Sequence, residues 1–295
     1  MPLLEITYSL HCDFHTLSET NVEIAKFPLT SNPLKEIVFT QPTVADGLAF
    51  AALVESEDEV NTTHYLNKLQ GENPDDSALW TVQDRRTALW WIFVNSRSDA
   101  VMTFSYECQF CKGMHHADID MTSLADTVEL LTVPAFVKTS VPVNGVPTNW
   151  TLKPLDGRGA EMLERLRELL PDPEDTKNHE QKLAELRIAE IALCTSLDDD
   201  PDDFKEAANR RFDIINTMAI ETEFTPLVAR IQLMQRDLRH GLDMVIDKGR
   251  AHFVLPPQQC KKAQEGVDAK TVLHVPFCNH EFIPSLKPKR VDHPD

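Results

Sequence analysis

Cys108-Gln109-Phe110-Cys111-Lys112-Gly113 is the sharpest local signal in the sequence, because it joins two strand-like segments at a tight turn. The residues before the turn, 101–107, and those after it, 115–121, both have the character of strands. Two thiolates on such a turn can reach one tetrahedral ion, and the glycine permits the bend. The pattern predicts a strand, a knuckle and a returning strand, with half of a zinc site at the knuckle.

A zinc site needs two further ligands, and two parts of the chain could supply them. His115 and His116 follow the knuckle, but adjacent residues of a strand face opposite sides, so only one of them can join the site. The other source is a predicted pair of C-terminal strands, whose surroundings contain Cys260, Cys278 and His280. Ligands from that pair would tie the two ends of the chain's middle part together.

We predict a zinc ion held by four cysteines, which are Cys108, Cys111, Cys260 and Cys278. Ala263 stands where the partner thiol of Cys260 would complete a second Cys-x-x-Cys, so a ribbon that has lost its metal and holds by packing is the alternative. A redox role would need a helix N-terminus beside the thiols to lower their pKa, and a knuckle between two strands does not provide one.

The amino-acid composition limits the classes of molecule that the chain can be expected to bind. Forty-seven acidic and 29 basic residues give a net charge of −18, which repels phosphate backbones, and no local basic patch stands out. No apolar stretch approaches the roughly 20 residues that a membrane-spanning helix needs. Six cysteines are too few and too unevenly spaced for a disulfide scaffold. We expect an intracellular protein that binds other proteins and neither nucleic acid nor membrane; whether it forms an oligomer stays open.

Enzyme signatures are missing from the sequence. The chain has nine glycines, no phosphate-binding glycine loop, no His-Glu-x-x-His and no nucleophile elbow. Asp118 and Asp120 lie on one face of the predicted strand, but a lone carboxylate pair is more typical of a solvated edge than of a catalytic dyad. We therefore predict no catalytic residues and no enzymatic activity.

The remaining segments predict an α+β fold with a long helical insertion. Thr43 is placed to cap a first helix with Asp46 in the capping-box position. A helix through residues 79–93 should bury its Trp90-Trp91 pair and expose Asp84, Arg85 and Arg86. Asn144-Gly145 is a strong turn signal within a β excursion. Four amphipathic helices are expected beyond Gly157, over 160–170, 176–196, 202–219 and 225–247.

These elements define four regions. Alternation over residues 5–15 indicates a β-hairpin in an N-terminal region at 1–39. The other three are helices plus the zinc-ribbon-like Cys-x-x-Cys element at 40–157, a helical region at 158–249, and C-terminal strands that complete the ribbon at 250–295.

The order of several motifs resembles the baseplate hub or tail assembly proteins of T-even-like contractile-tailed bacteriophages. The residues that carry the resemblance are Gln41-Pro42-Thr43-Val44-Ala45-Asp46, Thr62 to Leu69, the apolar helix over 78–94, Cys108-x-x-Cys111 with Asp118-x-Asp120-Met121, and Val275-Pro276-Phe277 with Phe282-Ile283-Pro284. The resemblance implies a non-enzymatic structural or chaperone role, with tail or baseplate hub proteins as partners, in the host cytoplasm and in any virion that retains the protein. The chain departs from the family pattern in its lone Cys260 and in its unmatched segment 158–248.

Two other functions stay open from the residues. A zinc-ribbon adaptor in transcription or regulation would need a basic surface. A metal-dependent hydrolase would use Cys108, Cys111, a histidine and Asp118 or Asp120, with one open coordination position on the metal.

Overall fold

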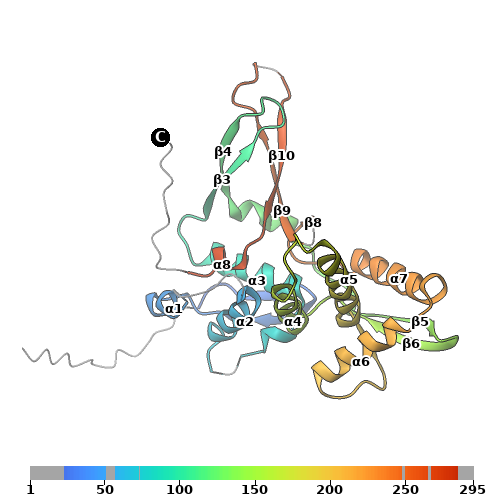
Figure 1. Ribbon diagram of the computed structural model, residues 1–295. Helices are drawn as coiled ribbons and strands as arrows, with labels where there is room; N and C mark the ends of the chain where they lie inside the picture. Colours follow the sequence, from blue (N-terminus) through green and yellow to red (C-terminus); the bar gives the residue numbers. More distant parts are fainter. Residues whose placement is uncertain (1–22, 51–56, 73, 248–249, 265–266, 285–295) are drawn as a thin grey trace, which may run out of the picture.

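The computed structural model describes residues 23–50, 57–72, 74–247, 250–264 and 267–284, and these form an α+β protein, as predicted. Figure 1 shows helices gathered around the base of the molecule and two β-hairpins that project from it side by side. The alternating residues 5–15, on which the predicted N-terminal β-hairpin rests, lie outside the described residues. No helix in the described part of the chain is both long and apolar enough to span a membrane.

A short hairpin and two helices begin the described chain. The hairpin pairs two antiparallel strands, and Thr43 then caps the first helix, with its side chain and that of Asp46 each accepting a backbone N–H of the other residue. The predicted capping box is thus confirmed. These elements are β1 (Phe27–Leu29), β2 (Asn32–Ile37), α1 (Val44–Ala49) and α2 (Asp58–Lys68).

Helix α3 (Val82–Asn95) follows the 3-10 turn η2 (Ser77–Leu79) and runs through the middle of the first core. Trp90 is buried, as predicted, but the expectation that Asp84 and Arg85 are exposed is wrong, because their exposed fractions are 0% and 1%. Charged residues on one stripe of a helix indicate a solvated face only when one side of the helix meets water. Here neighbouring elements cover that stripe and supply hydrogen-bond partners.

The projecting hairpins form a ribbon from distant parts of the sequence. The predicted strand, knuckle and returning strand over residues 101–121 are confirmed by a hairpin in which Val101 pairs with Asp120 and Glu107 with Met114. A second, three-stranded sheet lies beside it, in the order β10-β9-β8. The strands are β3 (Val101–Glu107), β4 (Met114–Asp120), β8 (Met244–Asp247), β9 (Arg250–Gln259) and β10 (Lys270–Pro276).

The middle of the chain folds between these hairpins. The Asn144-Gly145 turn is confirmed, with φ of 50° and 79° at the two residues, and it joins β5 to β6. The last predicted helix ends at Asp237 rather than at residue 247, because Gly241 takes a positive φ and the chain then continues as a strand. The elements are β5 (Val137–Val143), β6 (Val146–Leu152), α4 (Gly157–Glu168), α5 (Thr176–Leu193), β7 (Thr195–Leu197), α6 (Phe204–Asn216), the π-helical turn η4 (Ile220–Phe224) and α7 (Thr225–Asp237).

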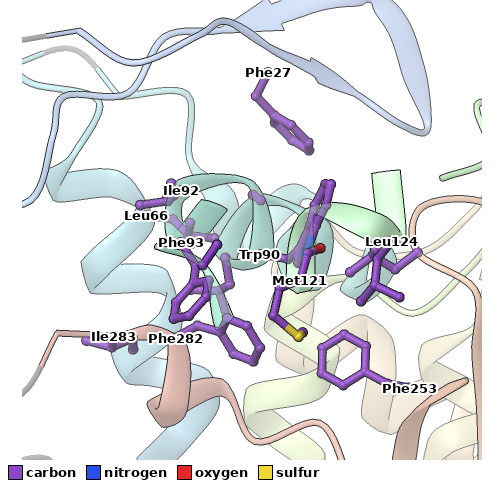
Figure 2. Close-up of a cluster of buried hydrophobic side chains, with 14 of the residues drawn as sticks. Phe27, Leu66, Trp90, Ile92, Phe93, Met121, Leu124, Phe253, Phe282 and Ile283 are labelled. Carbon is purple, nitrogen blue, oxygen red and sulfur yellow. The ribbon is translucent and has the colours of Figure 1, made fainter. Parts of the chain in front are cut away.

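Buried side chains form two main cores. The residues of the second core lie, in the sequence, between two groups of residues that form the first core. The first is built on α3 and draws on residues 27–124 and 242–283; Figure 2 shows Trp90 of α3 close to Met121, with Phe253 and Phe282 from the C-terminal part of the chain. The second, around Trp150, draws only on residues 131–238. The predicted boundary at residue 157 therefore falls inside the second core, and residues from about 130 to 240 form one inserted unit.

A buried polar network joins the two cores where the chain enters and leaves the inserted unit. Glu129 and Gly241 exchange backbone hydrogen bonds of 2.9 and 2.8 Å, so the two connecting segments lie side by side. Next to them, the Thr81 hydroxyl lies 2.7 Å from His240 Nε2 and 2.8 Å from Asp84 Oδ2. All three side chains are buried, so these bonds fix the connections against the first core.

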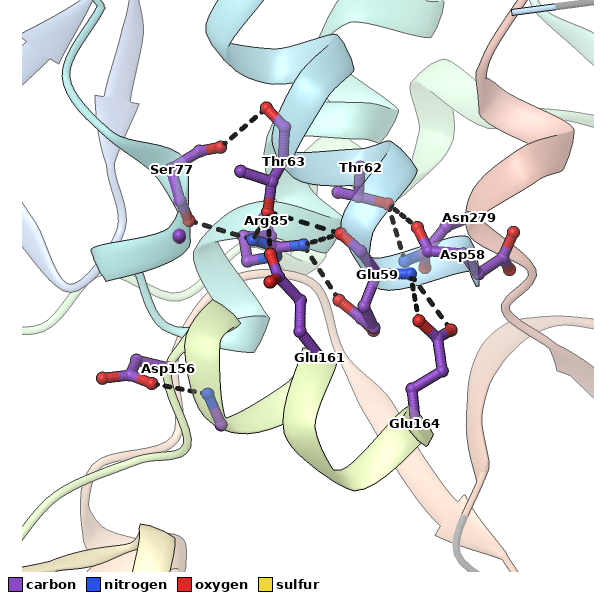
Figure 3. A network of polar contacts seen from close by, with 12 residues as sticks. Asp58, Glu59, Thr62, Thr63, Ser77, Arg85, Asp156, Glu161, Glu164 and Asn279 are labelled. Carbon is purple, nitrogen blue, oxygen red and sulfur yellow. Dashed lines mark hydrogen bonds and ion pairs between the residues drawn. The ribbon is translucent and has the colours of Figure 1, made fainter. Parts of the chain in front are cut away.

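A second network, around Arg85, joins α4 of the inserted unit to α2 and α3 (Figure 3). Arg85 donates to the Glu59 carboxylate at 3.0 Å and to the Thr63 hydroxyl at 2.7 Å. From α4, Glu161 accepts a hydrogen bond from Thr63, and both oxygens of Glu164 lie 3.1 Å from the backbone nitrogen of Glu59. Glu164 thus caps the N-terminus of α2 across the interface between the cores.

Candidate metal centre

Four side chains from the two hairpins converge at the free end of the ribbon. Their donor atoms all lie within 4.8 Å of one another. Cys108 follows β3, Cys111 lies in the knuckle, His115 belongs to β4, and Cys260 follows β9. Cys108, His115 and Cys260 are buried, and Cys111 is half-buried. The site therefore joins residues that are about 150 positions apart in the sequence.

The backbone of the first knuckle prepares Cys108 to bind a cation. Lys112 adopts a positive φ of 57°, and its N–H donates to the Cys108 carbonyl at 2.8 Å, which closes the turn. The backbone N–H groups of Cys111 and Phe110 point at the Cys108 sulfur. These donors, together with the Thr271 hydroxyl, lower the pKa of Cys108 to about 6. A thiolate is the form that ligates a metal, so the turn favours the ligating state.

The second turn repeats this arrangement with one thiol fewer. Cys260 donates its N–H to the Ala269 carbonyl at 2.8 Å, and its own carbonyl accepts from Ala263 at 3.2 Å. Burial raises the pKa of Cys260, and the neighbouring Cys108 sulfur acts in the same direction. Two thiols that lie this close favour one shared proton or a cation between them.

Hydrogen bonds between the hairpins hold the two turns together. The Gln109 N–H donates to the Thr271 hydroxyl at 3.1 Å, and the Lys261 ammonium donates to the His116 carbonyl at 3.2 Å. The two hairpins stand side by side in Figure 1. The prediction that distant thiol-bearing hairpins close into a small ribbon is thereby confirmed.

The structure brings together three of the four predicted ligands and replaces the fourth. Cys108, Cys111 and Cys260 belong to the group, whereas Cys278 lies outside it, at the N-cap of α8 (Asn279–Phe282) beside the first core. His115 takes the remaining place. His280, another candidate, lies 3.1 Å from Asp58 instead.

Strand alternation explains why His115 and not His116 enters the site. Along β4 the exposed and buried residues alternate, and His115 shares the buried face with Ala117 and Ile119. His116 faces outward and contacts the Ser105 hydroxyl at 2.8 Å. The sequence contained this signal, because the apolar residues at positions 117 and 119 mark the inward face. Asp118 and Asp120 fall on the exposed face, away from the thiols.

The donor set fits a zinc ion. Three thiolates and one imidazole are a common ligand set of tetrahedral structural zinc, whose bond lengths of about 2.0–2.3 Å correspond to donor separations of roughly 3.3–3.8 Å. His115 Nε2 lies 3.1 Å from the Cys111 sulfur, and its buried Nδ1 has no hydrogen-bond partner among the described residues. The ring therefore faces the thiols through Nε2, the nitrogen that a zinc ion at this point would bind.

Comparisons with other proteins give no further identification of this site. No family model, no curated protein and no solved structure matches the chain. The donor atoms, their burial and the turns that carry them are the observations on which a function can be argued.

Proposed function

We propose that the chain is a non-enzymatic, protein-binding component of a contractile phage tail or its baseplate hub, stabilised by one structural zinc ion. The ion is held by Cys108, Cys111, His115 and Cys260. The observation that carries the zinc assignment is this set of four donors, contributed by two hairpins that are far apart in the sequence. The phage assignment rests on the order of the sequence motifs.

The burial of the site supports a structural role for the metal. A structural zinc site is closed by four protein ligands, whereas a catalytic one keeps a position open for water or substrate. Here four protein donors lie within 4.8 Å of one another, and three of the four residues are buried. The carboxylates that a hydrolase would need, Asp118 and Asp120, lie on the opposite face of β4. The hydrolase alternative therefore has no support in the geometry.

The position of the site supports a role in holding the molecule together. Cys108 and Cys111 precede the inserted unit in the sequence, and Cys260 follows it. A metal between them closes the loop that contains the whole unit, and closing a long loop removes conformational freedom from the unfolded chain. Binding energy of the ion then becomes folding energy, as in other small structural zinc sites.

The phage assignment is supported by the order of sequence motifs and by the chemistry of the chain. The motifs from Gln41 to Met121 and at 275–284 follow the order of the baseplate hub and tail assembly family. The net charge of −18 and the lack of enzyme signatures agree with a soluble assembly component that acts by protein contacts.

Metal analysis of purified protein and variants tests the ligand assignment. We expect one zinc per chain in the unmodified protein and loss of zinc in Cys108→Ser and in Cys260→Ser. Cys278→Ser is the matched control and should keep its zinc. Full zinc in Cys108→Ser, or zinc loss in Cys278→Ser alone, would contradict the assignment.

The biological role is tested by affinity purification from phage-infected cells. Tagged protein should recover tail or baseplate hub subunits, identified by mass spectrometry. Recovery of none of them, at expression levels that match infection, would end the phage proposal while leaving the zinc assignment intact.

A further inference from the structure

The metal-bearing end of the ribbon presents an apolar surface to solvent. Phe110 sits at the knuckle between the two cysteines with 57% of its surface exposed, and Met114 at the start of β4 is 65% exposed. Both belong to the same end of the β3–β4 hairpin, since Met114 pairs with Glu107 at the last step before the turn. Packing within the ribbon does not account for apolar side chains at these two positions, because neither Phe110 nor Met114 contributes to a buried core.

Three lysines from two hairpins meet at the same end. Lys112 follows Cys111, and Lys261 and Lys262 follow Cys260. The fold brings them together: Lys261 donates to the His116 carbonyl, and the Lys262 ammonium lies 3.4 Å from the position that a Cβ on Gly113 would take. All three are exposed, and none takes part in the ion pairs among the residues that the structure describes. The sequence alone did not reveal this basic cluster, because its members are about 150 positions apart.

We propose that this surface, formed by Phe110, Lys112, Met114, Lys261 and Lys262 and here named the ribbon tip, binds an acidic segment of a partner protein that also carries aromatic or aliphatic side chains. The inference rests on the proposed protein-binding function and assigns it a surface. Lysines supply the charge complementarity, and Phe110 and Met114 supply the apolar anchors that well-packed interfaces use.

The charge distribution favours a short acidic segment over a nucleic acid. At physiological ionic strength a charge acts over about 8 Å, so a short segment at the ribbon tip meets the lysines and little of the remaining molecule. A nucleic acid extends further and would meet the acidic surplus of a chain with net charge −18. Three lysines would release few counterions from a phosphate backbone, so they give nucleic-acid binding little strength.

The lysines also lie close to the thiolates, and this proximity must be separated from partner binding. A zinc ion with three thiolates and one neutral imidazole carries a net negative charge, which nearby lysines offset. If that were their only role, their neutralisation would weaken zinc binding and leave binding to an acidic probe unchanged. The two effects are therefore distinguishable when zinc content and probe binding are both measured.

The test uses the full zinc-loaded chain and a fluorescent random copolymer of glutamate and tyrosine as the probe. Polyglutamate serves as the probe without apolar anchors, and oligothymidylate as the nucleic-acid probe. The variants are the triple change Lys112→Gln, Lys261→Gln and Lys262→Gln, and the single change Phe110→Ser. The matched control neutralises three other exposed lysines, by Lys138→Gln, Lys177→Gln and Lys205→Gln.

We expect the glutamate–tyrosine copolymer to bind the unmodified chain more tightly than polyglutamate does. The triple variant should weaken this binding about tenfold or more, since each exposed ion pair contributes up to about fivefold. Phe110→Ser should remove the preference for the tyrosine-containing probe, and the control triple should bind like the unmodified chain. Zinc content is measured for the unmodified chain and for every variant. An unmodified chain without zinc would count against the proposed function, whereas a variant that keeps its zinc and loses the probe has lost only the binding surface.

Three results would overturn the inference. They are copolymer binding that the triple variant leaves unchanged, tighter binding of oligothymidylate than of the copolymer, and no copolymer binding at low salt. If the triple variant loses its zinc, the test rests on Phe110→Ser, because the Phe110 side chain is exposed and its replacement should leave the zinc site intact. Equal affinity for both acidic probes, in the unmodified chain and in Phe110→Ser, would then rule out Phe110 as an apolar anchor.

Discussion

Glu164→Gln should make the protein more stable at pH 8 and leave its stability near pH 4 almost unchanged. Burial raises the pKa of Glu164 from 4.5 to about 7, and the neighbouring Glu59 and Asp58 carboxylates act in the same direction. The hydrogen bond that the Glu59 N–H donates to Glu164 lowers the pKa, because it favours the charged carboxylate. Since the pKa is raised in the folded state, the neutral form is the one that stabilises the fold.

The sign and size of the effect follow from linkage between protonation and folding. The stability contributed by the neutral carboxyl is fully present below about pH 4.5 and is lost as the pH rises to about 7. A shift from 4.5 to about 7 corresponds to at most about 3.4 kcal/mol. Glu164 is only half-buried, and solvent screening reduces this to roughly 1 kcal/mol. A glutamine avoids the loss because it stays neutral and its oxygen can still accept from Glu59.

Urea unfolding at a series of pH values between 4 and 8 measures the effect. The unmodified protein should lose roughly 1 kcal/mol more free energy of unfolding than Glu164→Gln across this range. Glu168→Gln, at an exposed position one turn further along α4, is the control and should follow the unmodified protein. A Glu164→Gln protein that is less stable than the unmodified protein at pH 8 would contradict this expectation. It would show that the charged carboxylate stabilises the fold more by capping α2 than it destabilises it by being buried.

Three further changes test other parts of the structure. Gly157→Ala should lower the free energy of unfolding by about 1–3 kcal/mol, measured in urea, because the added Cβ would lie 2.8 Å from Arg85 Cζ and 3.0 Å from Ala78 Cα; unchanged stability would show that Arg85 is not fixed there. Thr81→Val should cost about 1–3 kcal/mol by removing the α3 cap and leaving Asp84 and His240 without their shared hydroxyl, whereas Thr81→Ser should retain most of the stability; equal losses in both variants would argue against the hydroxyl network. Removal of zinc with a chelator should lower the melting temperature by about 10 °C, and a melting curve that the chelator leaves unaltered would deny the ion a structural role.

Local sequence signals predicted the elements whose geometry depends on nearby residues. The capping box of Thr43 and Asp46, the Asn144-Gly145 turn and the knuckle at Cys108 all formed as expected. In each case a few adjacent residues satisfy their own hydrogen bonds or supply the required backbone conformation. Such features need little from the remainder of the fold, so the sequence is enough to find them.

Features that depend on distant contacts were harder to predict. Arg85 is buried because Glu59, Thr63 and Ser77 surround it, and no pattern within α3 contains that information. The strand after Asp237 likewise depends on its pairing with β9. Both differences arise because a helix or strand at the centre of a fold is determined by its neighbours as well as by its own periodicity.

The ligand set shows the same division between local and distant information. Cys108 and Cys111 were predictable from their spacing, and the ribbon itself from the two turns. The choice between Cys278 and His115 depended on where the chain leaves β10, which the C-terminal sequence does not specify. The one local signal for the observed arrangement was that His115 lies two residues before Ala117 in a strand, so that both side chains face the buried side.

X-ray absorption at the zinc edge of the purified chain distinguishes the possible ligand sets of the ribbon, because it counts the atoms bound to the metal. Three sulfur ligands at about 2.3 Å and one nitrogen at about 2.0–2.1 Å are expected, from the two hairpins that the ion joins. Four sulfur ligands, or an oxygen in place of the nitrogen, would contradict this account of the ribbon.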